Sequence, residues 1–248
     1  MDGWGALSQF TSARIALGRA GGSWRTQTLL DFRLAHARAR DAVLKEFCID
    51  ALEVEIHGVG FETLRIFTDA GERQTFLQRP DLGRRLNQPS RDLLSEELAS
   101  WGKRDLLVMV SDGLSALATE RQSVAVLRRL LPLLADAGWT VYPVLIVPFA
   151  RVKLQDEVGQ LLGARHSLML LGERPGLGSP DSLGAYFTYH PNVEKSDADR
   201  NCISNIRAEG LPPEAAAEKL ALWLIESARL SLSGVALKEV SVARQIDG

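Results

Sequence analysis

Cysteine and long apolar runs are both scarce in this chain. Its 248 residues include two cysteines, Cys48 and Cys202, which lie far apart. Such cysteines lack the paired spacing of a zinc site or a disulfide framework and favour a reducing cytoplasm. No stretch approaches the roughly 18 apolar residues that a membrane span requires, and the first residues lack the basic-then-apolar layout of a secretory signal. We therefore expect a soluble protein that is neither exported nor embedded in a membrane.

An excess of charge of either sign is also absent. The 29 basic and 31 acidic side chains leave a net charge of −2, so no overall field selects nucleic acid or anionic lipid as a partner. The first 45 residues are locally basic, which fits either a docking surface or a solvated helix face. Their basic residues are Arg14, Arg19, Arg25, Arg33, Arg38, Arg40 and Lys45.

The first 50 residues are predicted to form an arm separate from the core. Several glycines up to residue 22 indicate extended structure. Between 26 and 47, Leu30, Leu34, Ala37 and Leu44 recur at helical spacing, which places them along one face of a helix. We divide the chain into 1–50, an N-terminal arm and helix that docks to another subunit, and 51–248, a core domain large enough to bury its apolar side chains.

A unit of strand, polar loop and helix occurs three times in the core. The strands are predicted at 105–110, 141–147 and 167–171, and such continuous apolar runs are typical of parallel strands covered on both faces. Thr119 and Gln122 fit a capping box at the start of the first helix, which Gly138 ends. A further strand at 185–189, a polar stretch at 199–205 and a final helix near Pro212 follow. The pattern predicts an α/β fold with a doubly wound parallel sheet.

Polar residues follow all three predicted strands, where open α/β sheets bind their ligands. Asp112 ends the first strand in a Ser-Asp-Gly turn, which we interpret as structural. Glu173 follows the third strand and is compatible either with pairing to Arg174 or with accepting hydrogen bonds from a ligand amide. Cys202, taken alone, fits simple burial better than a ligand contact.

Familiar catalytic and nucleotide-binding motifs are missing. The glycines at 18–22 and 176–178 lack the strand, third glycine or lysine of a phosphate-binding loop. The four histidines do not show the spacing of a metal pair, and none lies beside a nucleophile motif. These residues therefore predict neither a catalytic group nor a metal ligand.

Runs of up to twelve residues match the phrases of one family in order. They include Gly-Glu-Arg-Pro-Gly-Leu-Gly at 172–178 and Asp-Arg-Asn-Cys-Ile-Ser-Asn-Ile at 199–206, and others lie at 11–22, 34–43, 79–86, 110–115, 151–154 and 233–235. On these phrases the chain resembles the small (light) subunits of bacterial ethanolamine ammonia-lyases. The resemblance covers nearly the whole chain and ends at Lys238.

The resemblance implies a Rossmann-like fold and a role in converting ethanolamine to acetaldehyde and ammonia with adenosylcobalamin. In this family the cofactor lies between the small subunit and a catalytic large subunit, so the implied task of 51–248 is to bind the cofactor without performing the chemistry. The family's cofactor contacts carry over to Val152, Glu173 and Cys202. A hetero-oligomer in the cytoplasm, free or enclosed in a bacterial microcompartment, is also implied.

The sequence further bears on the state of the cofactor. No Asp-x-His-x-x-Gly occurs, so nothing resembles the histidine that replaces the cofactor's own base in other cobalamin proteins, and we expect the benzimidazole to stay on cobalt. Two alternatives remain: a non-enzymatic module that binds cobalamin or a nucleotide for sensing or delivery, and a free-standing Rossmann oxidoreductase. The missing dinucleotide motif disfavours the oxidoreductase.

Overall fold

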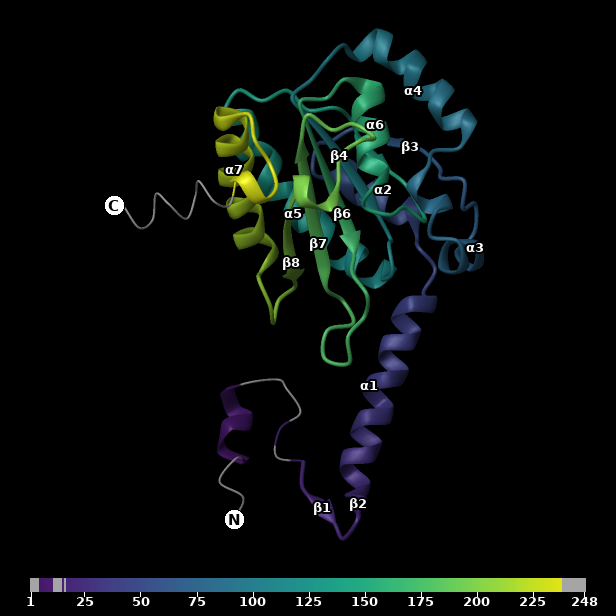
Figure 1. Ribbon diagram of the computed structural model, residues 1–248, viewed down its shortest axis with the longest axis vertical. Coiled ribbons are helices and arrows are strands. Elements are labelled where there is room, and N and C mark those ends of the chain that lie inside the picture. Colours follow the sequence, from purple (N-terminus) through teal and green to yellow (C-terminus); the bar gives the residue numbers. More distant parts are fainter. Residues whose placement is uncertain (1–4, 11–14, 16, 238–248) are drawn as a thin grey trace, which may run out of the picture.

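A six-stranded sheet forms the centre of the computed structural model, which describes residues 5–10, 15 and 17–237 (Figure 1). Its strands lie in the order β3 (Thr63–Arg65), β5 (Val144–Ile146), β4 (Leu106–Ser111), β6 (His166–Gly172), β7 (Leu183–Tyr189) and β8 (Arg200–Ile206). The first four run parallel, whereas β7 is antiparallel to both β6 and β8. The three strands predicted from apolar runs correspond to β4, β5 and β6.

The prediction of a purely parallel sheet is wrong at one edge. The segment between β6 and β7 contains no helix, so the chain turns back as a hairpin instead of making the crossover that a parallel pair needs. The polar stretch at 199–205 is the edge strand β8, where Ser204 and Asn205 are exposed. The strand order also differs from the 3-2-1-4-5-6 order of the Rossmann fold. The structure therefore supports an α/β fold with a mixed sheet and does not confirm a Rossmann-like, doubly wound arrangement.

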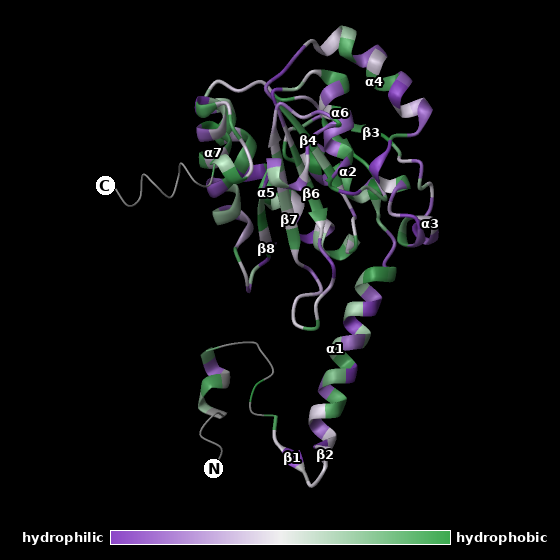
Figure 2. Ribbon diagram, in the orientation of Figure 1, coloured by the Kyte–Doolittle hydropathy of each residue, from purple (hydrophilic) through white to green (hydrophobic). Residues whose placement is uncertain are grey.

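Helices cover both faces of the sheet. Val108 and Val110 of β4 join the core under α2 (Ile49–Gly58), α5 (Ala116–Asp136) and α7 (Pro213–Leu230). Leu107 and Met109 join the core under α4 (Gln88–Trp101) and α6 (Leu154–Leu162). Because alternate residues enter two different cores, β4 is apolar from Leu106 to Val110, and Figure 2 shows this concentration of hydrophobic residues in the central strands. Short helices at α3 (Arg73–Gln78), η2 (Leu82–Arg84) and η3 (Asp197–Asp199) complete the body.

The helix after β4 begins earlier than predicted. Ser115 is the N-cap of α5, and its hydroxyl oxygen accepts a hydrogen bond from the Ala118 amide at 3.2 Å. Thr119 lies one turn further on and donates to the Ser111 carbonyl at 2.7 Å. The capping-box prediction at Thr119 and Gln122 is wrong because Ser115 already caps the first turn. The predicted helix end is confirmed, since Gly138 follows the C-cap with a φ of +79°.

The helix α1 (Thr26–Leu44) projects from the α/β body (Figure 1). The hairpin of β1 (Arg19–Ala20) and β2 (Ser23–Trp24) lies beyond its far end, and the short helix η1 (Gly5–Phe10) lies to one side of α1. The predicted apolar face is not covered, because Leu30, Leu34 and Leu44 are 52%, 51% and 60% exposed. The buried residues of α1 are Ala35 and Ala42, on a different side of the helix. Among the helices described, none has the length and apolar character to cross a bilayer.

Candidate functional site

Two adjoining hollows lie at one end of the sheet. The smaller, of about 380 Å³, lies over the ends of β4, β5 and β6, and the larger, of about 640 Å³, extends from the loop after β5 toward β8. Arg151 and Tyr186 line both hollows, so the two share a wall. Their volumes fall within the roughly 300–1,000 Å³ typical of small-molecule and cofactor sites. The position is also the one expected for ligands of open α/β sheets.

The structure gathers the three predicted contact residues around this shared wall. Val152, from the loop between β5 and α6, and Cys202, from β8, line the larger hollow. Glu173, directly after β6, lines the smaller one. Tyr186 connects them, since it is paired with Cys202 across the sheet and its hydroxyl lies 3.5 Å from Glu173 Oε1. Burial raises the pKa of Tyr186, which keeps the hydroxyl protonated as a hydrogen-bond donor.

Glu173 is oriented by neighbours on β7 and β8. Its Oε2 accepts hydrogen bonds from the Ser182 hydroxyl at 2.5 Å and from the Asn205 amide at 3.2 Å. Gly184 makes room for this arrangement, because a Cβ there would lie 2.7 Å from the Tyr186 ring and 2.9 Å from Glu173 Oε1. Within the described residues Glu173 makes no ion pair with Arg174, so the first of its two interpretations is wrong. The carboxylate retains acceptor capacity toward the hollow.

Asp112 holds the loop that carries Arg151 and Val152. Its Oδ1 accepts from the Phe149 amide at 2.7 Å, and its Oδ2 accepts from Arg73 Nη1 at 2.9 Å. Phe149 has a left-handed φ of +58°, a conformation that costs a non-glycine residue about 1–3 kcal/mol. Burial of the carboxyl raises the pKa of Asp112 to about 6. These contacts agree with the structural role predicted for the Ser-Asp-Gly turn.

A buried ion pair lies beneath the larger hollow. Arg200 at the start of β8 donates to Asp156 of α6 at 2.6 Å, and Lys153 reaches the same oxygen at 2.9 Å. The side chains of Arg200 and Asp156 are 4% and 0% exposed. The pair joins the helix that follows Val152 to the strand that carries Cys202, so it fixes the distance between two walls of the hollow.

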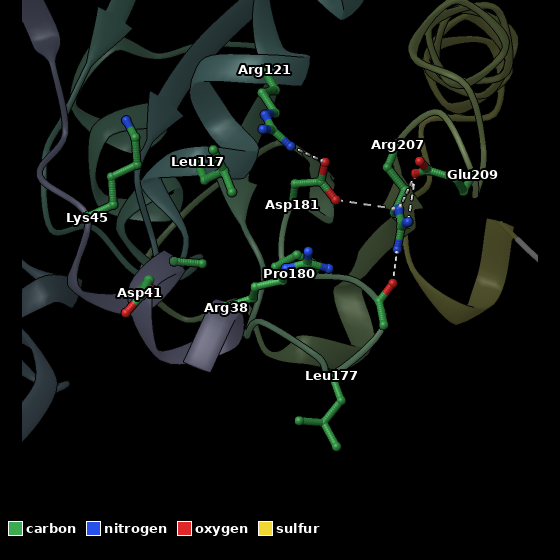
Figure 3. A pocket seen from close by; sticks show the side chains of 12 residues that line it. Arg38, Asp41, Lys45, Leu117, Arg121, Leu177, Pro180, Asp181, Arg207 and Glu209 are labelled. Carbon is green, nitrogen blue, oxygen red and sulfur yellow. Dashed lines mark hydrogen bonds and ion pairs between the residues drawn. The ribbon is translucent and has the colours of Figure 1, made fainter. Parts of the chain in front are cut away.

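A third and larger hollow, of about 720 Å³, lies between the end of α1 and the loop after β6 (Figure 3). On the side of the loop after β6 its charged groups pair with one another: Asp181 pairs with Arg121 at 2.9 Å and with Arg207 at 3.6 Å, and Arg207 also pairs with Glu209 at 2.6 Å. Arg207 donates in addition to the Gly178 carbonyl at 2.6 Å. This network holds the loop in place, and none of Val152, Glu173 and Cys202 lines this hollow, so we regard the other two hollows as the candidate site.

Comparisons with known proteins agree on one family over nearly the whole chain. The model of a family described as "Ethanolamine ammonia-lyase light chain (EutC)" matches residues 1–238. The chain belongs to this family. It is 50% identical to an ethanolamine ammonia-lyase small subunit of Pseudomonas putida (strain W619) over 245 residues, which are 98% of this chain and 90% of that protein. Another small subunit, from Azotobacter vinelandii, is 48% identical over 250 residues, covering 99% and 91% of the two chains.

Several residues of the candidate site were not identified from the sequence alone. Tyr186 lies in a predicted strand with no sign of a special role, and the partnership of Asp156 with Arg200 joins residues 44 positions apart. Arg151 was not identified either, although it stands directly before Val152 in the matched phrase at 151–154 and that adjacency is a signal that could have found it. The structure is needed because strand pairing, not spacing along the chain, brings these side chains together.

Proposed function

We propose that this chain is the cofactor-holding subunit of an ethanolamine ammonia-lyase complex that converts ethanolamine to acetaldehyde and ammonia. The observation that carries the proposal is the meeting of Val152, Glu173 and Cys202 around Tyr186, on a chain 50% identical to small subunits of that lyase. The cofactor we propose is adenosylcobalamin, which supplies radical chemistry when bound. The reacting residues then belong to the large subunit, and this chain binds and orients.

The residues of the two hollows fit such a ligand. A corrin has amide groups at its periphery and apolar edges, and it needs both acceptors and donors. Glu173 offers acceptor oxygens, whereas Arg151 offers guanidinium donors, because its side chain lines both hollows. Val152 and Leu171 provide apolar wall. Hollows open to solvent on one side suit a cofactor whose other side is covered by a partner.

We also propose that the benzimidazole stays on cobalt. The residues that line the two hollows, within the described part of the chain, include no histidine. His166 is fully buried, and burial lowers its pKa to about 3, but it packs between Trp139 and Tyr189 as part of the fold. The described residues that line the two hollows therefore include no imidazole suited to replace the cofactor's own base.

The partner in this proposal is the large subunit, and the docking element is the arm at 1–50. Leu30 and Leu34 form an uncovered apolar row on α1 beside Arg33 and Arg38. Exposed apolar rows rimmed by charge are typical of subunit interfaces. The two dispersed cysteines fit assembly in the reducing cytoplasm, whether free or inside a microcompartment.

Reconstitution tests the proposal. The purified chain is mixed with the large subunit of the same organism, ethanolamine and adenosylcobalamin, and acetaldehyde is measured by a coupled dehydrogenase assay. We expect acetaldehyde only when both subunits and the cofactor are present. A folded complex that contains an active large subunit and releases none contradicts the proposal, and tight cobalamin binding by this chain alone favours a delivery or sensing module.

A further inference from the structure

Three arginines without carboxylate partners surround the candidate site. Arg151 lines both hollows, Arg84 lines the larger and Arg174 the smaller. Within the part of the chain that the structure describes, none of the three forms an ion pair. Arg151 does have fixed geometry: its guanidinium lies 4.1 Å from the centre of the Phe76 ring, and it donates to the Phe76 carbonyl at 3.2 Å.

Carboxylates offset the positive charge of these arginines only in part, because Glu173 lines the smaller hollow and Asp197 the larger, but neither forms an ion pair with any of the three. Burial lowers the pKa of Arg151, and repulsion from Arg84, Arg73 and Arg174 lowers it further. The nearest compensating carboxylate, Asp112, is already bonded to Arg73. The Nε of Arg151 is buried without a partner, and an unsatisfied charged donor is costly to bury. The site therefore has an excess of positive charge on guanidinium groups that line the hollows, which suits an anion.

The other basic groups that line the two hollows each have a carboxylate nearby. Lys153 and Arg200 are bonded to Asp156, and Lys195 lies 3.8 Å from Asp199. Glu173 is the one carboxylate that lines the smaller hollow in the described residues, and it is held by Ser182 and Asn205. The unmet positive charge thus belongs to Arg84, Arg151 and Arg174, which we call the arginine cluster.

We propose that the arginine cluster binds the phosphodiester of the cobalamin nucleotide tail. This inference rests on the cofactor proposed above. The peripheral groups of the corrin are uncharged amides, so the phosphodiester is the anionic group that the cofactor presents to a protein. Guanidinium groups match phosphate oxygens in geometry and form charge-assisted hydrogen bonds with them. The arginine cluster then holds the nucleotide tail, while Glu173 and Val152 contact the corrin. In this arrangement the arginine cluster determines specificity for corrinoids that carry a phosphate.

A pair of corrinoids that differ only in phosphate tests the inference. The complex of this chain with its large subunit is titrated with adenosylcobinamide phosphate and with adenosylcobinamide, and dissociation constants are obtained from the visible absorption change or by calorimetry. We expect the phosphate to tighten binding about tenfold or more in the unmodified complex. Arg151→Gln and Arg174→Gln should each lose most of that difference. Arg129→Gln is the matched control, because Arg129 forms an exposed pair with Glu218 on the far helices.

Each outcome separates the two proposals. A complex that binds both corrinoids equally well keeps the cofactor-holding function and overturns the phosphate site. Arginine variants that weaken both ligands equally, or that disrupt assembly by size-exclusion chromatography, assign the cluster to corrin amides or to the partner and also overturn it. A complex that binds neither ligand contradicts the proposed cofactor-holding function. Arg174 is exposed, so its variant remains informative even if Arg151→Gln does not fold.

Discussion

Arg200 donates to Asp156 at 2.6 Å with both side chains buried, and this pair links β8 to α6 beneath the larger hollow. Removing one member of a buried pair leaves the other charged and poorly solvated. We expect Arg200→Met to lower the free energy of unfolding by about 3 kcal/mol, the lower end of the usual range, because Lys153 still reaches Asp156. Urea unfolding measures the effect.

The matched control for this pair is Arg129→Met. Arg129 and Glu218 are 2.6 Å apart, but both side chains are about half exposed, so its loss should cost less than about 1 kcal/mol. Equal costs for the two variants would show that burial adds nothing to the Asp156–Arg200 pair.

Asp112 gives the protein a predictable pH dependence. The folded pKa is raised to about 6 from 3.8, so between about pH 4 and 6 the folded chain keeps a proton that the unfolded chain has lost. Stability from this group is therefore present below pH 4 and declines as the pH rises through 6, by up to about 3 kcal/mol. Relative to Asp112→Asn, the wild-type free energy of unfolding should fall over this window. Parallel pH profiles of the two proteins, measured by urea unfolding, would contradict it.

Glu173 should matter for the cofactor more than for the fold. Glu173→Ala removes an acceptor that is half-buried at the edge of the hollow, and we expect the dissociation constant of adenosylcobalamin in the complex to rise about tenfold. The melting temperature of the cofactor-free chain should stay nearly unchanged. Glu218→Ala, on the outer surface, serves as the control. A large loss of melting temperature in Glu173→Ala alone would instead identify a structural glutamate.

The exposed leucines of α1 should control assembly. We expect Leu30→Asp with Leu34→Asp to weaken association with the large subunit at least tenfold, because charge replaces apolar interface, while thermal unfolding of the body is unaffected. Deleting residues 1–22 should act in the same direction. The control is Leu222→Asp on α7, a leucine that is 68% exposed but lies outside the arm. Unchanged co-elution of the α1 variant with the large subunit would remove the arm from the interface.

The sequence predicted the parts of the fold that depend on local pattern. Buried strands such as β4 and β6 are visible as continuous apolar runs, and α7 begins at Pro213 as its prolines indicated. The antiparallel edge was missed because a polar edge strand such as β8 has the composition of a loop. Leu30 and Leu34 were placed on one face correctly, but only the structure shows that both leucines remain exposed among the described residues.

Some residues of the candidate site were likewise predicted from the sequence, and others became visible only in the structure. Val152, Glu173 and Cys202 came from family phrases, and each lies on a different element of the sheet end. Tyr186 carries no local signature, because its place in the site arises from strand pairing. Arg84 lies in the matched phrase at 79–86, but its proximity to Arg151 becomes visible only when distant segments come together. The spacing of residues along the sequence reveals motifs, whereas the unpaired charge of the arginine cluster is visible only in the folded site.

The pairing of Asp156 with Arg200 also has a consequence for biosynthesis. The chain leaves the ribosome from its N-terminus, so α6 and the loop that carries Val152 emerge well before β8. Until Arg200 follows, Asp156 has no guanidinium partner and the wall that carries Cys202 does not exist. A product truncated before residue 200 therefore lacks this ion pair and the wall that carries Cys202, so the larger hollow is complete only once β8 has been made.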